Sequence, residues 1–162
     1  MKKTMQDAMN EQINKELFSA YLYLSMAAYF EDKNLSGFSK WMRAQEAEER
    51  EHAMKFYDFI LERGGKVTLK AIGAPKTEWK SSMEAAEEVA AHEASITDSI
   101  NALYELALKE KDYPAQIMLQ WFISEQVEEE KNAANIVANL KLIEDRGTAV
   151  LMLDKTLGKR GG

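Results

Sequence analysis

The chain has 162 residues, of which 46% are hydrophobic and 30% are charged, so it is long enough for one folded domain and too polar for a membrane protein. Its formal net charge of −6 and its scattered Lys and Arg residues argue against nucleic acid as a partner, because phosphate binding needs a concentrated basic face. The absence of Cys excludes disulfides, thiolate metal sites and cysteine nucleophiles. We expect a cytoplasmic protein, since no apolar signal segment opens the chain and no stretch is long enough to span a membrane.

Helical periodicity predicts five helices in chain order, over residues 4–32, 36–63, 81–111, 113–145 and 148–157. Gly64 and Gly65 form a natural stop for the second helix. Ser81, followed three residues later by Glu84, is a capping-box signature that opens the third. Asp112 is a suitable N-cap for the fourth helix, whose first turn tolerates proline. A mainly α-helical chain is therefore expected.

The connections predict how the four long helices pack. Short links join the first helix to the second and the third to the fourth, so each pair is an antiparallel hairpin. Residues 66–80 have no helical period, contain Gly73 and Pro75, and are long enough to cross the length of a bundle. We therefore predict one all-α domain over residues 1–162, a four-helix bundle with one long crossover connection and a short fifth C-terminal helix.

Each long helix has one apolar stripe, and polar residues interrupt every stripe near its middle. The interrupting residues are Glu16 in the first helix, Gln45, Glu49 and His52 in the second, Glu93 in the third, and Gln126 and Glu129 in the fourth. The interval from Glu16 to Glu49 equals the interval from Glu93 to Gln126. Two hairpins packed about a pseudo-twofold axis would bring all these residues to one level of the bundle.

Several carboxylates buried together require neutralisation by protons or by a bound cation. Carboxylate oxygens with one imidazole suit iron or manganese better than zinc or copper. A Glu from each of two helices plus a Glu-x-x-His pair, here Glu49 and His52, is the arrangement of carboxylate-bridged di-metal sites. A single Glu in a helix is more often a solvated residue, but interruptions at the same height in four stripes favour a metal site.

Three stretches resemble the non-haem ferritins of bacteria and archaea: Glu16–Tyr23, Glu48–Ala53 and Leu119–Glu130. The resemblance covers essentially the whole chain and implies the ferritin-like form of the bundle. It implies iron storage and detoxification, in which O₂ or H₂O₂ oxidises Fe(II) at a di-iron ferroxidase site within each subunit. The ferric product would be deposited as a mineral inside a hollow homo-oligomeric shell of 24 subunits. No haem is expected.

The resemblance also implies roles for individual residues. Glu16, Glu49 and His52 would bind the first iron. Glu49 would bridge to a second iron, which Glu93 and Glu129 also hold.

Further roles follow from the same resemblance. Gln126 would be a hydrogen-bonding group beside the two irons, and Tyr23 matches a tyrosine near them. Glu48, Glu125 and Glu128, with Glu129 shared, match an additional third iron site. Trp121 matches a nearby aromatic that is credited with supplying electrons.

The two hairpins are not equivalent, because Gln126 and Glu129 stand where a symmetric site would have a second Glu-x-x-His. Fewer firm ligands should leave the second iron more weakly held, which suits a substrate that is oxidised and passed on. The alternative is a carboxylate-bridged di-iron oxidase or peroxidase with permanently bound irons and no storage role. A bacterioferritin would have His in place of Glu129, and the common rubrerythrin form is excluded because its iron domain needs four cysteines.

The sequence also bears on two other protein classes and on whether copies of the chain assemble. A DNA-protecting mini-ferritin would lack the fifth helix, and an interaction module would have uninterrupted apolar stripes. Oligomerisation is predicted from the fifth helix and from apolar residues off the inner stripes, namely Leu22, Met42, Tyr57 and Trp79. His92 is expected on the surface or at a subunit contact. Animal ferritins have channel carboxylates where this chain has Gln116 and Leu119, which leaves the route of iron into the shell undecided.

Overall fold

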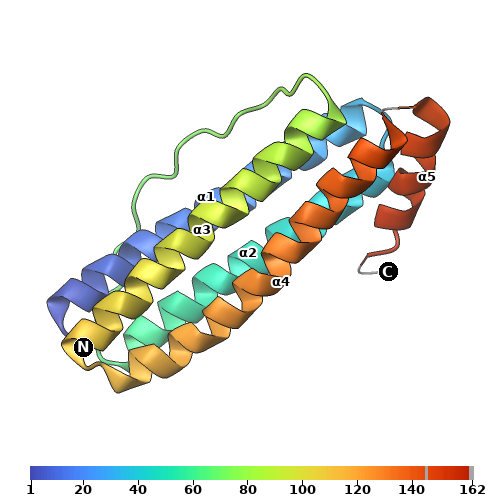
Figure 1. Cartoon of the computed structure of the whole chain (residues 1–162). Helices are drawn as coiled ribbons and strands as arrows, with labels where there is room; N and C mark the ends of the chain where they lie inside the picture. The colour runs from blue at the N-terminus through green and yellow to red at the C-terminus, as the bar shows by residue number, and fades with distance from the viewer. Residues whose placement is uncertain (145, 161–162) are drawn as a thin grey trace.

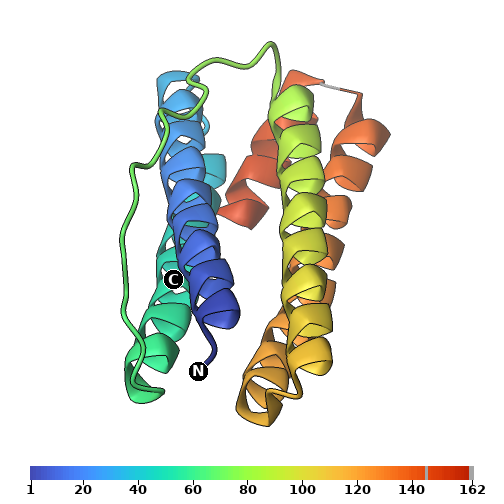
Figure 2. The same cartoon turned by 90° about the vertical axis from the view of Figure 1, so that its left-hand side faces the viewer.

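A computed structural model describes residues 1–144 and 146–160 of the chain, and within them it contains helices but no strands. The helices are α1 (Lys3–Asp32), α2 (Ser36–Glu62), α3 (Ser82–Glu110), α4 (Tyr113–Ile143) and α5 (Gly147–Leu157) (Figure 1). The first four form a bundle of two antiparallel hairpins, and α5 packs across one end (Figures 1 and 2). The predicted all-α fold class, a four-helix bundle with one crossover and a short fifth helix, is confirmed.

The helices begin where their capping residues predict. The Ser81 hydroxyl accepts a hydrogen bond from the backbone N–H of Glu84 at 3.1 Å, and the Glu84 carboxylate accepts one from Lys80 N–H. Asp112 caps α4 by accepting from Ala115 N–H at 3.1 Å. At the other end, α4 stops at Ile143, whereas the sequence predicts an end at Asp145, which lies outside the described residues.

The crossover, residues 63–81, runs in an extended form along the outside of α1 (Figure 2). Asn10 holds it at two points, donating from Nδ2 to Lys66 O at 3.0 Å and accepting at Oδ1 from Thr68 N–H at 2.8 Å. Farther along, the Ser25 hydroxyl donates to Lys76 O at 2.6 Å. Polar side chains on the outer face of α1 thus replace the strand partners that an extended segment would otherwise need.

Two apolar clusters fill the bundle, one toward each end. Phe30 and Phe38 stack with ring centroids 4.7 Å apart in one cluster, and Phe56 and Phe122 stack at 4.3 Å in the other. The predicted apolar stripes are buried throughout, except that Phe59 is half-buried. The interrupting carboxylates lie between the clusters, where water has little access.

The fifth helix docks on the start of α2. Asp154 accepts a hydrogen bond from Phe38 N–H at 2.8 Å and so supplies an N-terminal partner for α2 from a distant part of the chain. Gly37 permits the approach, because a Cβ atom at that position would lie 1.6 Å from the Asp154 carbonyl oxygen.

Several surface expectations are wrong. Leu22, Met42 and Trp79 are buried within the single chain, and Tyr57 is half-buried, so they give no argument for oligomerisation. Trp79 is covered because the crossover folds it against Tyr29, with ring centroids 5.3 Å apart.

The exposed apolar residues lie elsewhere, and they include Ile117, Leu142 and Met152. Leu119 is buried in the core and therefore does not line a channel. None of the helices in residues 1–144 and 146–160 is both long and apolar enough to cross a membrane.

Candidate metal centre

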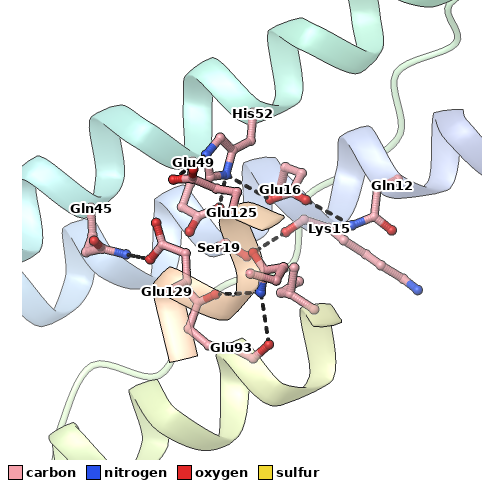
Figure 3. A network of polar contacts seen from close by, with 12 residues as sticks. Gln12, Lys15, Glu16, Ser19, Gln45, Glu49, His52, Glu93, Glu125 and Glu129 are labelled. Atoms are coloured by element: carbon pink, nitrogen blue, oxygen red, sulfur yellow. Dashed lines mark hydrogen bonds and ion pairs between the residues drawn. The ribbon is translucent and has the colours of Figure 1, made fainter. Parts of the chain in front are cut away.

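The predicted ligands meet in the middle of the bundle. Their side chains come from all four long helices and point toward one another (Figure 3). Among the described residues, three groups have ligand atoms that all lie within 4.8 Å of one another, and two of them share Glu49. Glu16, Glu49 and His52 form the first group, and Glu49, Glu93 and Glu129 form the second. All five residues are at most 4% exposed. Because Glu49 belongs to both groups, the geometry provides two adjacent cation positions with one shared carboxylate.

The first group joins α1 to α2. His52 Nδ1 lies 3.2 Å from Glu49 Oε2 and 4.0 Å from Glu16 Oε2. Gln12 Nε2 donates to Glu16 Oε1 at 2.9 Å. Among the described residues, no hydrogen-bond partner reaches the buried atoms Glu16 Oε2 and Glu49 Oε1. Unpaired buried oxygens are costly, so their convergence beside an imidazole fits a bound cation.

The second group joins α2 to the α3–α4 hairpin. The Tyr23 hydroxyl donates to Glu93 Oε1, and Gln126 Nε2 lies 3.2 Å from Glu93 Oε2. The same Gln126 nitrogen also lies 3.1 Å from the hydroxyl oxygen of Thr97. Glu129 Oε2 accepts from Gln45 Nε2 at 2.9 Å. This group contains carboxylates and amides but no imidazole, which makes it the less strongly coordinating half.

Burial dominates the electrostatics of the centre. It raises the pKa of Glu49 well above the ordinary value, and repulsion from Glu16 and Glu93 adds to the effect. Burial also raises the pKa of Glu93, although hydrogen bonds from Tyr23 and Gln126 oppose the shift. For Glu129, burial and the charge of Glu93 raise the pKa to about 8. Without a cation the centre therefore holds protons at neutral pH, and a cation must displace them.

The residues predicted for a third iron site are only partly brought together. Glu125 forms a ligand group with His52 and Glu129, and its Oε1 lies 4.0 Å from His52 Nε2. Glu48 lies close enough to raise the pKa of Glu129, but its Oε1 is 2.8 Å from Arg160 Nη2. Glu128 is exposed and belongs to none of the ligand groups found among the described residues.

Two aromatic residues flank the centre. Tyr23 is fully buried, and burial with the charge of Glu93 raises its pKa well above the ordinary value, so its hydroxyl keeps its proton. The Trp121 ring stands edge-on to the His52 ring with centroids 5.5 Å apart, and 42% of Trp121 is exposed. Lys55 places its ammonium group 4.2 Å from the Trp121 ring centroid. Trp121 therefore connects the first metal position to the molecular surface.

His92 was expected on the surface or at a subunit contact; the ring is partly buried within the chain, and the subunit contact stays a prediction. Its ring is half-buried between α1 and α3, with Nε2 2.6 Å from the Ser19 hydroxyl oxygen. It also stands edge-on to the Tyr23 ring, with centroids 6.2 Å apart. Burial lowers its pKa, so His92 is neutral at physiological pH.

The roles of Gln12 and Gln45 were missed in the sequence. Gln45 interrupts the α2 stripe, which indicates burial but not a partner. Gln12 precedes Glu16 by four residues, a spacing that places two side chains side by side on one helix face. That spacing is a signal that could have indicated the hydrogen bond.

An all-α bundle with a buried carboxylate–histidine centre belongs to the class of metal-binding four-helix bundles. The family model described as "Ferritin-like domain" matches residues 6–143. A bacterial non-heme ferritin from Bacteroides fragilis is 41% identical, with 96% of this chain and 97% of that protein covered. Another, from Staphylococcus haemolyticus, is 39% identical over 99% of this chain and 96% of that protein. The chain belongs to the ferritin family.

The solved structures agree with this assignment. An open pore ferritin from the hyperthermophilic archaeon Archaeoglobus fulgidus is 50% identical and superposes with a TM-score of 0.98, with 99% of both chains covered. A humanized archaeal ferritin is 49% identical and superposes with a TM-score of 0.99, covering 100% of this chain and 99% of that one. The resemblance inferred from the sequence motifs to the non-haem ferritins is confirmed.

Proposed function

We propose that this ferritin oxidises Fe(II) to Fe(III) at the centre formed by Glu16, Glu49, His52, Glu93 and Glu129, and stores the product as a ferric mineral. Family membership supports iron storage. The observation that carries the ferroxidase proposal is the sharing of Glu49 by two ligand groups. Oxygen donors with one imidazole suit iron, and anionic oxygens stabilise Fe(III) relative to Fe(II).

Two adjacent iron positions suit the electron balance of the reaction. Each Fe(II) loses one electron, and the pair together supplies the two electrons that reduce O₂ to the level of hydrogen peroxide. H₂O₂ is the alternative oxidant, reduced by the same two electrons to water. The protons come from water and from the carboxyl groups that lose their protons when iron binds. The raised pKa values of Glu49, Glu93 and Glu129 support this release.

The asymmetry of the centre supports storage over a permanent di-iron cofactor. The first group has an imidazole, whereas the second has none and has the amide of Gln126 beside Glu93. An iron held without imidazole dissociates more readily and is free to move on. The alternative function, a di-iron oxidase or peroxidase with permanently bound irons, needs firm binding in both halves.

We further propose a hollow shell of 24 copies, each a single ferritin-like domain over residues 1–162, with no haem. Exposed apolar side chains on α4 and α5, such as Ile117, Leu142 and Met152, support burial between copies. A third iron site using Glu125, with Glu48 and Glu128 as further candidates, would lie beside the second group. A cytoplasmic location, and the absence of nucleic-acid or membrane partners, stay predictions.

A test combines assembly with oxidation. The purified protein is sized by exclusion chromatography, loaded with Fe(II) without oxygen, and then exposed to O₂ while Fe(III) absorbance is followed. Glu49→Ala removes the shared carboxylate and should reduce the fast oxidation rate by about 100-fold or more, with assembly unchanged. Glu51→Ala, an exposed position on the same helix, is the matched control and should oxidise iron normally. A normal rate in Glu49→Ala would reject the proposed centre.

The same experiment separates storage from a permanent cofactor. After repeated additions of Fe(II) and O₂, a storage protein holds far more iron than its centres can bind. A preparation that retains only two irons per chain through gel filtration, with no mineral growth, would favour the oxidase or peroxidase alternative.

A further inference from the structure

The carboxylates of the centre differ in whether a glutamine amide holds them. Gln12 donates to Glu16, as described above, and Gln45 donates to Glu129, both at 2.9 Å. Glu93 likewise faces Gln126. Glu49 is the exception: no glutamine reaches it, its Oε1 has no hydrogen-bond partner, and its Oε2 faces His52 (Figure 3). Glu49 is also the carboxylate that the first and second ligand groups have in common.

Gln12 and Gln45 reach their carboxylates in different ways. Gln12 and Glu16 are neighbours on one face of α1, whereas Gln45 reaches from α2 across the bundle to Glu129 on α4. The two glutamines are 2% and 0% exposed. Burying an amide costs free energy unless its polar atoms are paired, and Gln45 Oε1 has no partner. Packing alone is therefore a poor explanation for a glutamine at this position.

An amide N–H on one carboxylate oxygen fixes the plane of the group and leaves the other oxygen for a metal. A carboxylate without such a donor can use both oxygens and can bridge two metals. We infer that Gln12 and Gln45 are positioning residues, one for each iron position, which present Glu16 and Glu129 as terminal ligands and leave Glu49 as the bridge. The inference rests on the proposed two-iron centre. It adds that the glutamine amides determine which carboxylates bind one iron and which carboxylate bridges two.

Substitution by Met tests this, because Met has nearly the length of Gln but no N–H donor. Co(II) is used as the probe, under conditions without an oxidant, and its two binding steps are measured by calorimetry. Proton NMR reports the first position separately, since a paramagnetic ion there shifts the His52 imidazole signals. Gln12→Met should weaken binding at the first position by about tenfold or more and leave the second within about twofold. Gln45→Met should give the reverse pattern.

The control is Gln120→Met, which makes the same chemical change at an exposed position on α4 and should alter neither step. If a Met variant fails to fold, as judged by circular dichroism, Gln12→Asn and Gln45→Asn replace them. Asn keeps the amide, but its shorter side chain cannot reach the carboxylate. The same loss of Co(II) affinity at one position is therefore expected.

The outcomes separate the two proposals. Wild-type protein that binds fewer than two Co(II) ions per chain would reject the two-iron centre itself. Two normal binding steps in the wild type, with both steps weakened equally or neither weakened in the glutamine variants, would overturn the positioning role alone.

Discussion

The two hairpins of the bundle have the same backbone architecture but different chemistry at the same height. In the α1–α2 hairpin, Glu16, Glu49 and His52 combine two carboxylates with an imidazole. In the α3–α4 hairpin, Glu93 and Glu129 supply carboxylates without an imidazole, and Gln126 places its amide beside Glu93. The difference teaches that a repeated fold can place two chemically different sets of candidate ligands side by side. Under the proposed function, such a difference would let iron bind long enough to be oxidised and then leave.

The largest expected effect is on the pH dependence of stability, and it arises from the raised pKa values in the α3–α4 half. Glu129 titrates at about 8 in the folded protein, against an ordinary value of 4.5. Between these values the folded chain binds more protons than the unfolded chain, so stability present at low pH is lost as pH rises toward 8. The metal-free protein should lose on the order of 1.4 kcal/mol of unfolding free energy per pH unit from this group between about pH 5.5 and 7, and less per unit as the pH approaches 8.

Urea unfolding of the metal-free protein across that range measures the effect. Glu129→Gln cannot titrate and should flatten the slope, while saturating Co(II) should abolish it by keeping the carboxylate ionised in the folded state. Stability that rises with pH in the metal-free wild type would contradict the proposed protonation of this half.

The second effect is on retention of the second metal. Glu129→His would give the α3–α4 hairpin an imidazole to match His52, and so make the halves more alike. We expect the second metal to dissociate more slowly, by on the order of tenfold, because an imidazole nitrogen holds Co(II) more firmly than a carboxylate oxygen does. Stopped-flow transfer of Co(II) to a chelator measures this rate, with Glu130→His on the same helix as the control. Faster or unchanged release would show that His52 is not the source of the asymmetry.

The smallest effect concerns the contact between Glu48 and Arg160, which lies beside the α2 side of the centre. A cation binding near Glu48 must displace this guanidinium. Arg160→Gln should therefore strengthen binding of a third divalent ion by only a few-fold, because partly exposed ion pairs contribute at most about 1 kcal/mol. Calorimetric titration with Co(II) beyond two equivalents tests it, with Lys159→Gln as control. Weaker third-ion binding in Arg160→Gln would mean that the arginine assists the site.

The sequence by itself determined the helices, their pairing and which polar residues gather at the candidate metal centre. Helical periodicity places Glu16, Glu49, Glu93 and Glu129 on apolar stripes, and a stripe on an antiparallel hairpin has only one way to face inward. Connection lengths then determine the topology, because short links force neighbours and one long link permits a crossover. Helix periodicity and connection length depend only on residues that are close in the sequence. They can therefore be predicted without knowing how side chains pack.

Only the tertiary structure decided which side chains meet across helices. The hydrogen bond from Gln45 to Glu129 depends on the rotation of α2 against α4, and the burial of His92 depends on Ser19 lying opposite it on α1. Trp79 is buried because the crossover lies along α1, a path that its composition does not specify. Gln45 was therefore predictable as an inward-facing residue but not as the partner of Glu129, because a helical stripe indicates that a residue faces inward and not which atom it contacts. The bond from Gln12 to Glu16 differs, since both residues lie on one helix face four positions apart.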